Sequence, residues 1–324
     1  MLGVYETLDD MLHEVLRALL KEKKTYTATK GEFTELFGCC LHLKNPRGRL
    51  SRSEGKSKVF SALGELMWYL SGETKLDFID YYIPGRFQQE SDDQISVRSG
   101  YGSRLFSFNG INQVNNIVNL LKAGGTSRRA VIQLFDASDL EQRYKSVPCT
   151  CTLQFIVRDD LLHMFVAMRS NDAFLGLPHD IFSFTMLQEL VARTLGLEIG
   201  DYKHCAGSLH LYTEHAAAAR QYLDEGFQSK IAMSPMPVGD PWQNVALLQA
   251  YERHLREGNS FESHPEWPSY WQHLACLLEA HQAYKKRDIA TLEKLTEQLR
   301  PTEFKMFVQA KVDALKHIKG TICV

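Results

Sequence analysis

Cys149 is the residue of this sequence whose surroundings best suit covalent chemistry. It stands near the start of an expected strand, just after a loop, in the run Pro148-Cys149-Thr150-Cys151-Thr152-Leu153-Gln154-Phe155. A cysteine in such a position is partly exposed, and a nearby cation would lower the pKa of its thiol and supply a thiolate nucleophile. The alternative is a buried structural cysteine, the commoner case for a lone cysteine. No second Cys or His pair at finger-like spacing accompanies Cys149 and Cys151, so we do not expect zinc.

Two consecutive arginines form a second candidate site. The run Thr126-Ser127-Arg128-Arg129-Ala130 joins a glycine-containing turn to an apolar strand. Paired guanidinium groups at such a junction suit bidentate binding of an anion. The alternative is a solvated pair of turn residues.

A third candidate site spans Arg169 to Asp180, with the sequence Arg-Ser-Asn-Asp-Ala-Phe-Leu-Gly-Leu-Pro-His-Asp. Its charged and hydrogen-bonding groups lie between a strand and a buried helix, and a polar group at the end of a strand is a reasonable place for a ligand. Gly176 and Pro178 indicate a fixed, tight backbone. Asp180 taken alone is also a good N-cap for a helix that starts at Ile181.

His210 and Tyr212 form the last candidate pair. Strand alternation would place both side chains on one face. His210 and His215 are five residues apart, not the four of a helical metal pair. The alternative is a core histidine and tyrosine with satisfied hydrogen bonds.

The hydrophobic pattern predicts the elements that carry these segments. Residues 45–57 form a basic loop, and residues 84–104 form a long loop of the kind that is often functional. The pattern predicts an α/β body, with strands at 32–44, 130–135, 150–157, 161–168 and 199–211, and helices at 4–22, 58–71, 110–122, 180–196 and 212–222.

The chain divides into two regions whose sequence patterns predict different secondary structure. Residues 1–226 mix strand and helix patterns, whereas 242–319 are almost purely helical apart from an interruption at 264–268. Glycine and proline punctuate the loop between the two regions. We therefore expect a catalytic domain at 1–226 and a helical C-terminal extension at 227–324 that packs on it.

Composition excludes several classes of protein. A hydrophobic content of 44% and a charged content of 23% are ordinary for a globular chain with a core, and a net charge of −2 argues against a coat for nucleic acid. Acidic residues near the N-terminus argue against a signal peptide, and no apolar run approaches the roughly 18 residues of a membrane span. Seven cysteines without a ladder-like spacing predict reduced thiols and a cytoplasmic location.

Taken together and in this order, the motifs closely resemble those of thymidylate synthase and its relatives, the pyrimidine nucleotide hydroxymethylases. The shared pattern lies between about residues 28 and 222. It comprises Glu65 in an apolar helix, Tyr101-Gly102 in the long loop, the Arg128-Arg129 pair, Pro148-Cys149 followed by Gln154-Phe155, Arg-Ser-x-Asp-x-x-Leu-Gly-x-Pro from Arg169, and His210-x-Tyr212.

The resemblance implies a mixed sheet with packed helices and a role for each matched residue. Cys149 would add to C6 of a pyrimidine nucleoside monophosphate, so that C5 attacks the one-carbon unit of 5,10-methylenetetrahydrofolate, a co-substrate, with no metal needed. The phosphate would be held by Arg169 and Ser170, and by Arg128 and Arg129 from the partner subunit of a homodimer. The other implied roles are sugar contacts by His210 and Tyr212, nucleotide placement by Gln154, folate contacts by Asp172, Gly176 and Trp68, and proton transfer through water by Glu65 and Tyr101.

Asp180 points to the identity of the base. The synthases carry Asn at this place, whose amide matches O4 and N3–H of uracil, whereas the cytidylate hydroxymethylases carry Asp. An ionised carboxylate suits the N4 amino group and a protonated N3 of cytosine, and facing uracil O4 would cost roughly 1–3 kcal/mol. The sequence therefore predicts a cytidine monophosphate, dCMP or CMP, as the substrate.

The loop at residues 80–87 bears on the product. Synthases carry a Trp in this region that shields the reacting carbon, and this sequence has none there. A pocket without that shield would admit water and favour hydroxymethylation. The alternatives are a synthase that methylates dUMP and a catalytically silent nucleotide- or RNA-binding relative.

Two further features depart from the synthase pattern. The family's N-terminal phosphate-binding arginine corresponds to Lys30 or is supplied by Arg47, Arg49 or Arg52. The C-terminal region is helical, which leaves open whether Val324 closes the folate site.

Overall fold

One mixed β-sheet organises the molecule. The computed structural model describes residues 2–53, 58–259, 267–300 and 302–322. The sheet order is β1-β3-β7-β6-β5-β4, with β2 paired to β3. β1 runs parallel to β3 and β6 runs parallel to β7, while the other neighbours are antiparallel. The strands are β1 (Leu2–Tyr5), β2 (Thr25–Ala28), β3 (Gly31–Leu43), β4 (Val131–Gln133), β5 (Thr150–Arg158), β6 (Leu161–Asp172) and β7 (Glu198–Tyr212).

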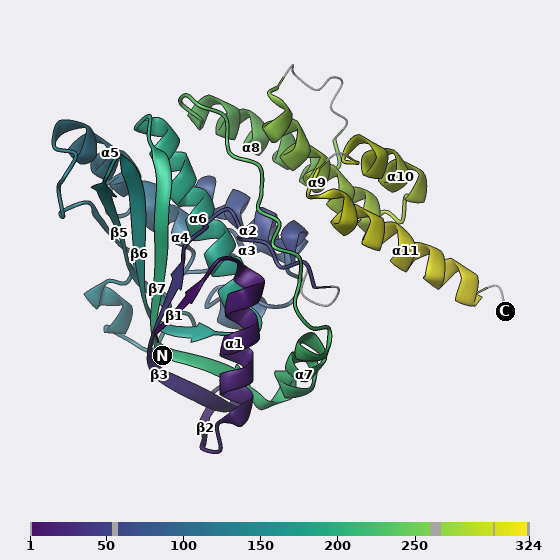
Figure 1. Ribbon diagram of the computed structural model, residues 1–324, viewed down its shortest axis with the longest axis horizontal. Helices are drawn as coiled ribbons and strands as arrows, with labels where there is room; N and C mark the ends of the chain where they lie inside the picture. Colours follow the sequence, from purple (N-terminus) through teal and green to yellow (C-terminus); the bar gives the residue numbers. More distant parts are fainter. Residues whose placement is uncertain (1, 54–57, 260–266, 301, 323–324) are drawn as a thin grey trace.

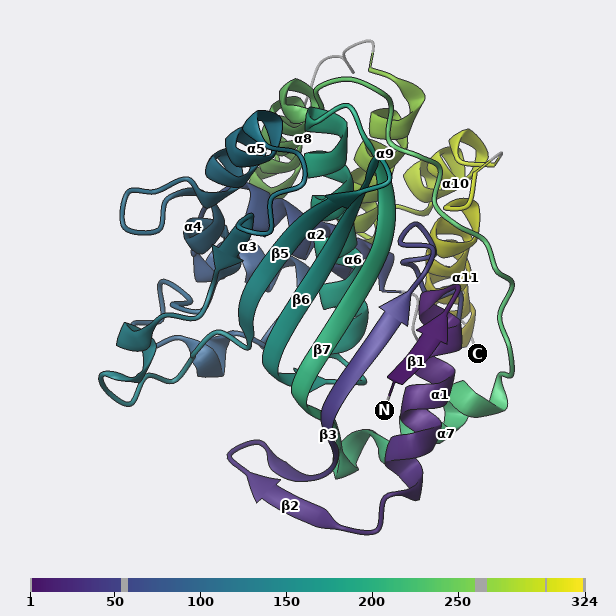
Figure 2. The same cartoon turned by 60° about the vertical axis from the view of Figure 1, so that its left-hand side comes forward.

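Helices cover one face of this sheet. In Figure 2 the sheet faces the viewer, and α2 (Val59–Leu70) and α6 (Gly176–Thr194) lie behind it. Nearly every residue of these two helices is buried, because α6 packs between the sheet and α2, and α2 packs between α6 and further helices. The residues of β5, β6 and β7 that face them are also buried, among them Leu153, Val166 and His204. The core of the molecule therefore lies between the sheet and α6.

The opposite face of the sheet is open. Residues that alternate with the core positions are half-buried or exposed, and they pair across the strands as Gln154 with Phe165 and Phe165 with Lys203. Val131, opposite Gln154, is 41% exposed. Figure 2 shows no helix in front of these strands.

Cys40 and Cys205 lie on this open face and are joined by a disulfide. They are direct partners in the antiparallel β3–β7 pair, and their Cα atoms are 4.1 Å apart. The expectation that all thiols are reduced is therefore wrong for this pair, because register, not sequence spacing, brings the two residues together. The free cysteines among the described residues are Cys39, Cys149, Cys151 and Cys276, and Cys323 lies outside them.

Shorter helices frame the sheet. α1 (Leu8–Lys21) is capped by Thr7, whose hydroxyl accepts a hydrogen bond from Asp10 N, and α1 packs beside α7. The helix expected at 4–22 therefore begins later, because residues 2–5 pair with β3 instead. The long loop expected at 84–104 ends in a helix that starts at Tyr101. These helices are α3 (Leu76–Tyr82), α4 (Tyr101–Phe106), α5 (Gln113–Ala123) and α7 (Ala216–Asp224).

The described part of the C-terminal region is helical, as the sequence pattern predicts, and contains four helices. They are α8 (Trp242–Glu257), α9 (Ser269–Lys285), α10 (Ile289–Gln298) and α11 (Lys305–Ile322). α8 and α9 pack against α2, and α10 forms a hairpin with α11 that extends to one side of the body (Figure 1). The predicted interruption at 264–268 falls partly on residues outside the described ones, as does Val324. No helix in the described ranges is long and apolar enough to span a membrane.

Candidate active site

Arg169 fixes the segment that carries Cys149. Its guanidinium donates hydrogen bonds to the carbonyl oxygens of Pro148 and Val147, both at 2.9 Å, and its backbone N–H donates to the carbonyl of Cys149 at 2.8 Å. The same guanidinium lies 3.7 Å from the Cys149 sulfur. The loop before β5 is thus held against the end of β6, with a cation beside the thiol.

The thiol of Cys149 has a raised pKa in this structure. Burial is the largest cause because it penalises the charged thiolate, and Asp180 and Glu90 act in the same direction. Arg169 and Lys30 lower the pKa without overcoming the burial. The sequence analysis expected a nearby cation to lower this pKa, and the cation is present, but the net shift has the opposite sign.

Tyr101 reaches the residue after the nucleophile. Its hydroxyl oxygen accepts hydrogen bonds from the backbone N–H and the side-chain hydroxyl of Thr150, at 3.1 and 2.9 Å. Burial raises the pKa of Tyr101 well above its usual range, and Asp180 and Cys149 add to the shift. Tyr101 therefore stays protonated, and its own O–H proton remains free to donate into the site.

Glu65 is buried in α2, one turn before Tyr69. The hydroxyl of Tyr69 donates to Oε1 of Glu65 at 2.7 Å. Burial raises the pKa of Glu65, and Arg86 partly offsets the rise. The Tyr69 ring lies 5.1 Å from that of Tyr101, so α2 and α4 bring both predicted proton-transfer groups to one place.

Asp172 ends β6 and shapes the turn into α6. Its Oδ1 accepts hydrogen bonds from the backbone N–H groups of Phe174 and Leu175, at 2.8 and 3.0 Å. Within the described chain, Oδ2 makes no such bond and remains available to a ligand. Gly176 follows in the first turn of α6, where an added Cβ would lie 3.1 Å from the Asn171 side-chain nitrogen and 3.5 Å from Asp180 Oδ2.

Asp180 lies inside α6 and is not its N-cap, because the helix begins four residues earlier than expected, at Gly176. Its Oδ2 accepts a hydrogen bond from the Asn171 amide at 2.7 Å. Burial, with the nearby charge of Glu65, raises the pKa of Asp180 to about 8, against the opposing effects of Asn171 and Arg86. Asp180 is therefore a protonated acid at neutral pH, not the ionised carboxylate that we expected from the sequence.

These side chains form one group, which we call the Cys149 cluster: Glu65, Tyr101, Cys149, Arg169, Asp172 and Asp180. Asp180 acts electrostatically on Cys149 and Tyr101, and Glu65 and Asp172 act on Asp180. Groups that shift one another's pKa inside a partly closed site are characteristic of catalytic centres.

Lys30 lies at the edge of the Cys149 cluster. It follows β2 in the turn before β3, and its ammonium group forms an ion pair with Glu90 at 2.5 Å. Both residues act on the pKa of Cys149, in opposite directions. The structure therefore brings Lys30 close enough to Cys149 to act on its pKa, and a role of Lys30 in binding an anion stays a prediction.

His210 and Tyr212 stand beside the Cys149 cluster on the last residues of β7. Their rings are 5.0 Å apart in an edge-to-face arrangement. Burial lowers the pKa of His210 and raises that of Tyr212, and the charge of Asp172 acts on both. Ser170 is half-buried on the neighbouring strand, paired with Ser208.

Four predicted residues lie elsewhere. Arg128 and Arg129 are exposed before β4, and the Arg128 carbonyl accepts a hydrogen bond from Gln154 at 3.0 Å. Gln154 alternates with two core residues and so belongs to the open face of the sheet, not to the Cys149 cluster. Trp68 is only 1% exposed and packs against Phe87, so its ring offers no free surface to a cofactor.

The structure also adds residues that sequence reasoning missed. Arg86, in the loop after α3, acts on Glu65, Asp172 and Asp180 at once. Asn171 contacts Asp180, and behind it His204 and Tyr202 continue a buried chain of hydrogen bonds. The only sequence feature that could have pointed to Arg86 as a site residue is the Pro84-Gly85-Arg86 turn. No local sequence feature distinguishes His204 as a hydrogen-bonding residue on a central strand.

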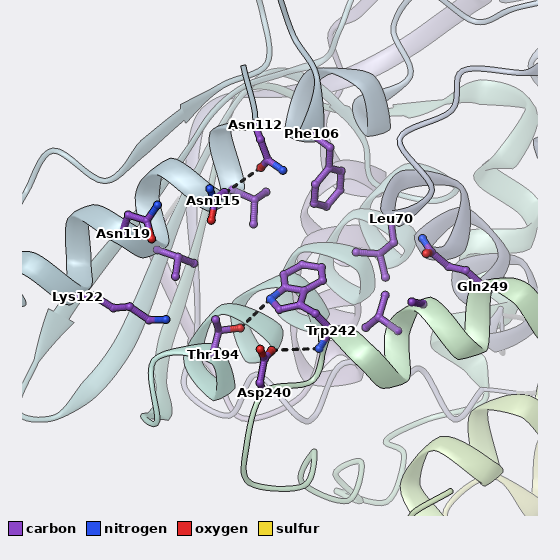
Figure 3. A pocket seen from close by; sticks show the side chains of 14 residues that line it. Leu70, Phe106, Asn112, Asn115, Asn119, Lys122, Thr194, Asp240, Trp242 and Gln249 are labelled. Carbon is purple, nitrogen blue, oxygen red and sulfur yellow. Dashed lines mark hydrogen bonds between the residues drawn. The ribbon is translucent and has the colours of Figure 1, made fainter. Parts of the chain in front are cut away.

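A separate pocket lies away from these residues. Its volume is about 470 Å³, and Figure 3 shows asparagines of the α5 segment on one side and Trp242 of α8 on the other. The Trp242 indole donates to Thr194 at 2.9 Å. None of the predicted site residues lines this pocket.

A comparison with protein families agrees with this geometry. The family model described as thymidylate synthase matches residues 8–237, more than two thirds of the chain and every element that carries the Cys149 cluster. Members of this family use methylenetetrahydrofolate for one-carbon transfer to a pyrimidine nucleotide and are typically dimeric. The chain therefore belongs to the thymidylate synthase family.

Proposed function

We propose that this protein transfers a one-carbon unit to C5 of a cytidine monophosphate, dCMP or CMP, and adds water to give the 5-hydroxymethyl nucleotide. The observation that carries the proposal is Asp180: a buried carboxylic acid, next to the nucleophile, at the place where uracil-specific relatives carry an amide.

Cys149 begins the reaction as a nucleophile. Its sulfur forms a bond to C6 of the base, and the electron pair of the C5–C6 double bond moves through C4 towards N3. Arg169, 3.7 Å from the sulfur, stabilises the thiolate that this step requires. The addition makes C5 nucleophilic, so that a carbon–carbon bond can form there.

Asp180 supplies the proton that this addition needs. A neutral cytosine offers an acceptor at N3 and a donor at its N4 amino group, which match the O–H and the carbonyl oxygen of a carboxylic acid. As Cys149 adds to C6, the Asp180 proton passes to N3 and neutralises the charge that develops there. A raised pKa keeps this acid protonated in the free enzyme.

The surroundings of the reacting carbon support addition of water. Synthases carry an indole near residues 80–87, whereas this chain contributes the guanidinium of Arg86, which acts on Glu65 and Asp172. A cation among carboxyl groups attracts water, where an indole would exclude it. Glu65, hydrogen-bonded to Tyr69, is the group that would accept a proton from that water.

Other residues bind the phosphate and the sugar of the nucleotide. Arg169, Ser170 and Lys30 surround the phosphate position, and His210 and Tyr212 contact the sugar. Arg128 and Arg129 are exposed on their own subunit and complete the phosphate site of a partner in a homodimer. The open face of the sheet, with Phe165 and Val131 on it, is the surface that pairs.

Methylenetetrahydrofolate supplies the one-carbon unit. The free Oδ2 of Asp172 suits the N–H donors of a pterin, and Gly176 allows α6 to pack closely against Asn171 and Asp172. We further propose that residues 227–324 are a helical extension of a catalytic domain at 1–226, in place of the short ending of the synthases.

Tritium release from C5 tests the proposal. The enzyme is given C5-labelled dCMP, CMP or dUMP with methylenetetrahydrofolate, and the product is weighed by mass spectrometry. We expect release from a cytidylate with a mass gain of CH₂O, and the two cytidylates identify the sugar. Release from dUMP alone, with a gain of CH₂, would make this protein a thymidylate synthase and refute the role given to Asp180.

A further inference from the structure

A chain of three hydrogen bonds runs from the core to Asp180. The Tyr202 hydroxyl lies 2.9 Å from Nδ1 of His204, Nε2 of His204 lies 3.0 Å from Oδ1 of Asn171, and Nδ2 of Asn171 lies 2.7 Å from Oδ2 of Asp180. Tyr202 and His204 come from β7, Asn171 from β6 and Asp180 from α6. We call Tyr202, His204 and Asn171 the Asp180 relay.

The relay is buried throughout. Tyr202 and His204 have no exposed surface, and Asn171 is 4% exposed. Burying polar groups is costly unless they are paired, and apolar side chains would fill the same space without that cost. Their pairing ends on the carboxyl group that we expect to read the base, which suggests a role beyond packing.

The proton positions along the relay follow from His204. Burial lowers the pKa of His204 to about 3, so its ring is neutral and carries one N–H. With Asn171 Oδ1 facing it, Nε2 must be the donor, and Nδ1 must accept from the Tyr202 hydroxyl. Each link then donates towards Asp180. The Asp180 oxygen at the end of the relay, Oδ2, is an acceptor, so the acid proton lies on Oδ1.

We propose that the Asp180 relay is a specificity-determining device that holds Oδ2 as the acceptor and Oδ1 as the donor towards the base. Tyr202, His204 and Asn171 are positioning residues, because they act through Asp180 and not on the substrate. The inference rests on the proposed function in taking Asp180 as the residue that reads cytosine.

Fixing the proton matters because a carboxylic acid can present two patterns. With the proton on Oδ1, Oδ1–H donates to N3 and Oδ2 accepts from the N4 amino group, which fits cytosine. With the proton on Oδ2, Oδ2–H is a donor at the position of N4, and Oδ1 is an acceptor at the position of N3. Uracil has an acceptor, O4, and a donor, N3–H, at these two positions, so this form fits uracil. A carboxyl group that is free to exchange the two forms would therefore discriminate poorly between the bases.

Three substitutions break the relay at different distances from Asp180. Asn171→Leu removes the last link, His204→Leu the middle one and Tyr202→Phe only the distal hydroxyl. His204→Gln is the conservative variant, because its amide N–H can still donate to Asn171. Tyr222→Phe is the matched control, since it removes another buried tyrosine hydroxyl, one that donates to Asp9 at 2.8 Å.

The readout is the ratio of kcat/KM for cytidylate to that for uridylate, with the ratio of Kd values as a second measure. We expect the ratio to fall about tenfold in Asn171→Leu and His204→Leu and about threefold in Tyr202→Phe, as expected for loss of a buried hydrogen bond. His204→Gln should restore most of it, and Tyr222→Phe should leave it unchanged. Melting temperatures identify any variant that is merely unfolded.

An unchanged ratio in Asn171→Leu and Tyr202→Phe would overturn the relay even if kcat falls, because a packing role lowers activity with both bases alike. The proposed function fails separately if the wild-type enzyme prefers cytidylate but does not form the 5-hydroxymethyl product, because the relay concerns only the choice of base. A wild-type preference for uridylate overturns both proposals, since an Oδ1–H donor and an Oδ2 acceptor match cytosine and not uracil. If the wild-type enzyme binds neither nucleotide, both proposals fail.

Discussion

The guanidinium of Arg169 and the sulfur of Cys149 are neighbours, 3.7 Å apart, at the junction of β6 and the loop before β5. Arg169 also binds the two carbonyl groups just before the cysteine. One side chain therefore both orients the nucleophile and stabilises its charged form.

Replacing Arg169 should slow the reaction of Cys149 with an alkylating reagent. Because the arginine lowers a thiol pKa that burial raises, Arg169→Ala should raise that pKa further and reduce the alkylation rate at pH 8 about tenfold. Arg169→Lys keeps the charge and should lose less. Mass spectrometry of iodoacetamide-treated protein gives the rate, and an equal rate in Arg169→Ala would contradict the role.

Cys149→Ala should abolish turnover while nucleotide affinity changes by no more than about threefold, because the sulfur acts after binding. Tritium release and calorimetric titration measure the two effects. Cys151→Ala is the control. Cys151 lies two residues after Cys149 and has a half-buried thiol, but it is not part of the Cys149 cluster. Substantial turnover in Cys149→Ala would exclude the covalent route.

Asp180→Asn should shift the preferred base from cytosine to uracil. The amide matches uracil when its NH₂ group faces O4 and its oxygen faces N3–H, an orientation that requires the Asn171 amide and the His204 tautomer to reverse. The mismatch with cytosine then costs about 1–3 kcal/mol, or roughly tenfold to a hundredfold in kcat/KM. Competition between dCMP and dUMP measures the change. A preference that stays with cytosine would show that another residue reads the base.

The stability of the protein should fall with rising pH because of Asp180. Its pKa is about 8 in the folded state against an ordinary 3.8, so the folded state holds this proton more tightly than the unfolded chain does. The stabilisation is complete below pH 4 and is lost as pH rises towards 8. Burial is the largest cause of this raised pKa; Glu65 from α2 and Asp172 from β6 raise it further, and Asn171 and Arg86 lower it.

Urea unfolding at several pH values checks this expectation. Asp180→Asn lacks the titrating group, so its stability relative to the wild-type protein should increase by a few kcal/mol between pH 4 and pH 8. A difference that does not vary with pH would mean that Asp180 titrates normally in the folded protein.

Mixed dimers test the shared arginines. Arg128→Ala and Cys149→Ala should each be inactive or nearly so, but a mixture should regain about a quarter of wild-type activity if each phosphate site draws on both subunits. The recovered heterodimers carry one site with both residues intact. Failure to recover activity after co-refolding would place Arg128 outside the partner's site.

The parts of the site that are local in sequence could be predicted. Cys149, Arg169 and Asp172 lie just beyond the ends of strands that the hydrophobic pattern identifies. In the structure Arg169 lies 3.7 Å from the Cys149 sulfur, and Asp172 acts electrostatically on Asp180. The mixed α/β fold was likewise confirmed. Periodicity sufficed there because each segment buries one face.

The parts of the site that depend on pairing between distant segments could not be predicted from the sequence. Nothing near His204 indicates that it reaches Asn171, and nothing near Cys40 points to Cys205, because strand register determines both contacts. The reversal of the expected Cys149 pKa shift has a similar origin, since burial depends on the whole fold and not on the neighbouring cation. The start of α6 was misplaced because Asp180 is a good N-cap by residue type, whereas the helix begins at Gly176.

β7 lies between β3 and β6 and is hydrogen-bonded to both, although β3 is made early and β7 is the last strand of the described chain to be made. During synthesis the edge of β3 that pairs with β7 therefore stays unpaired until residues up to Tyr212 have left the ribosome. Pairing across such a long separation is slow and exposes the chain to aggregation. Cys149 and Arg169 can come together when β5 and β6 pair, before β7 is made. Asp180, in contrast, gains its hydrogen-bonded link to His204 only when β7 is inserted between β3 and β6.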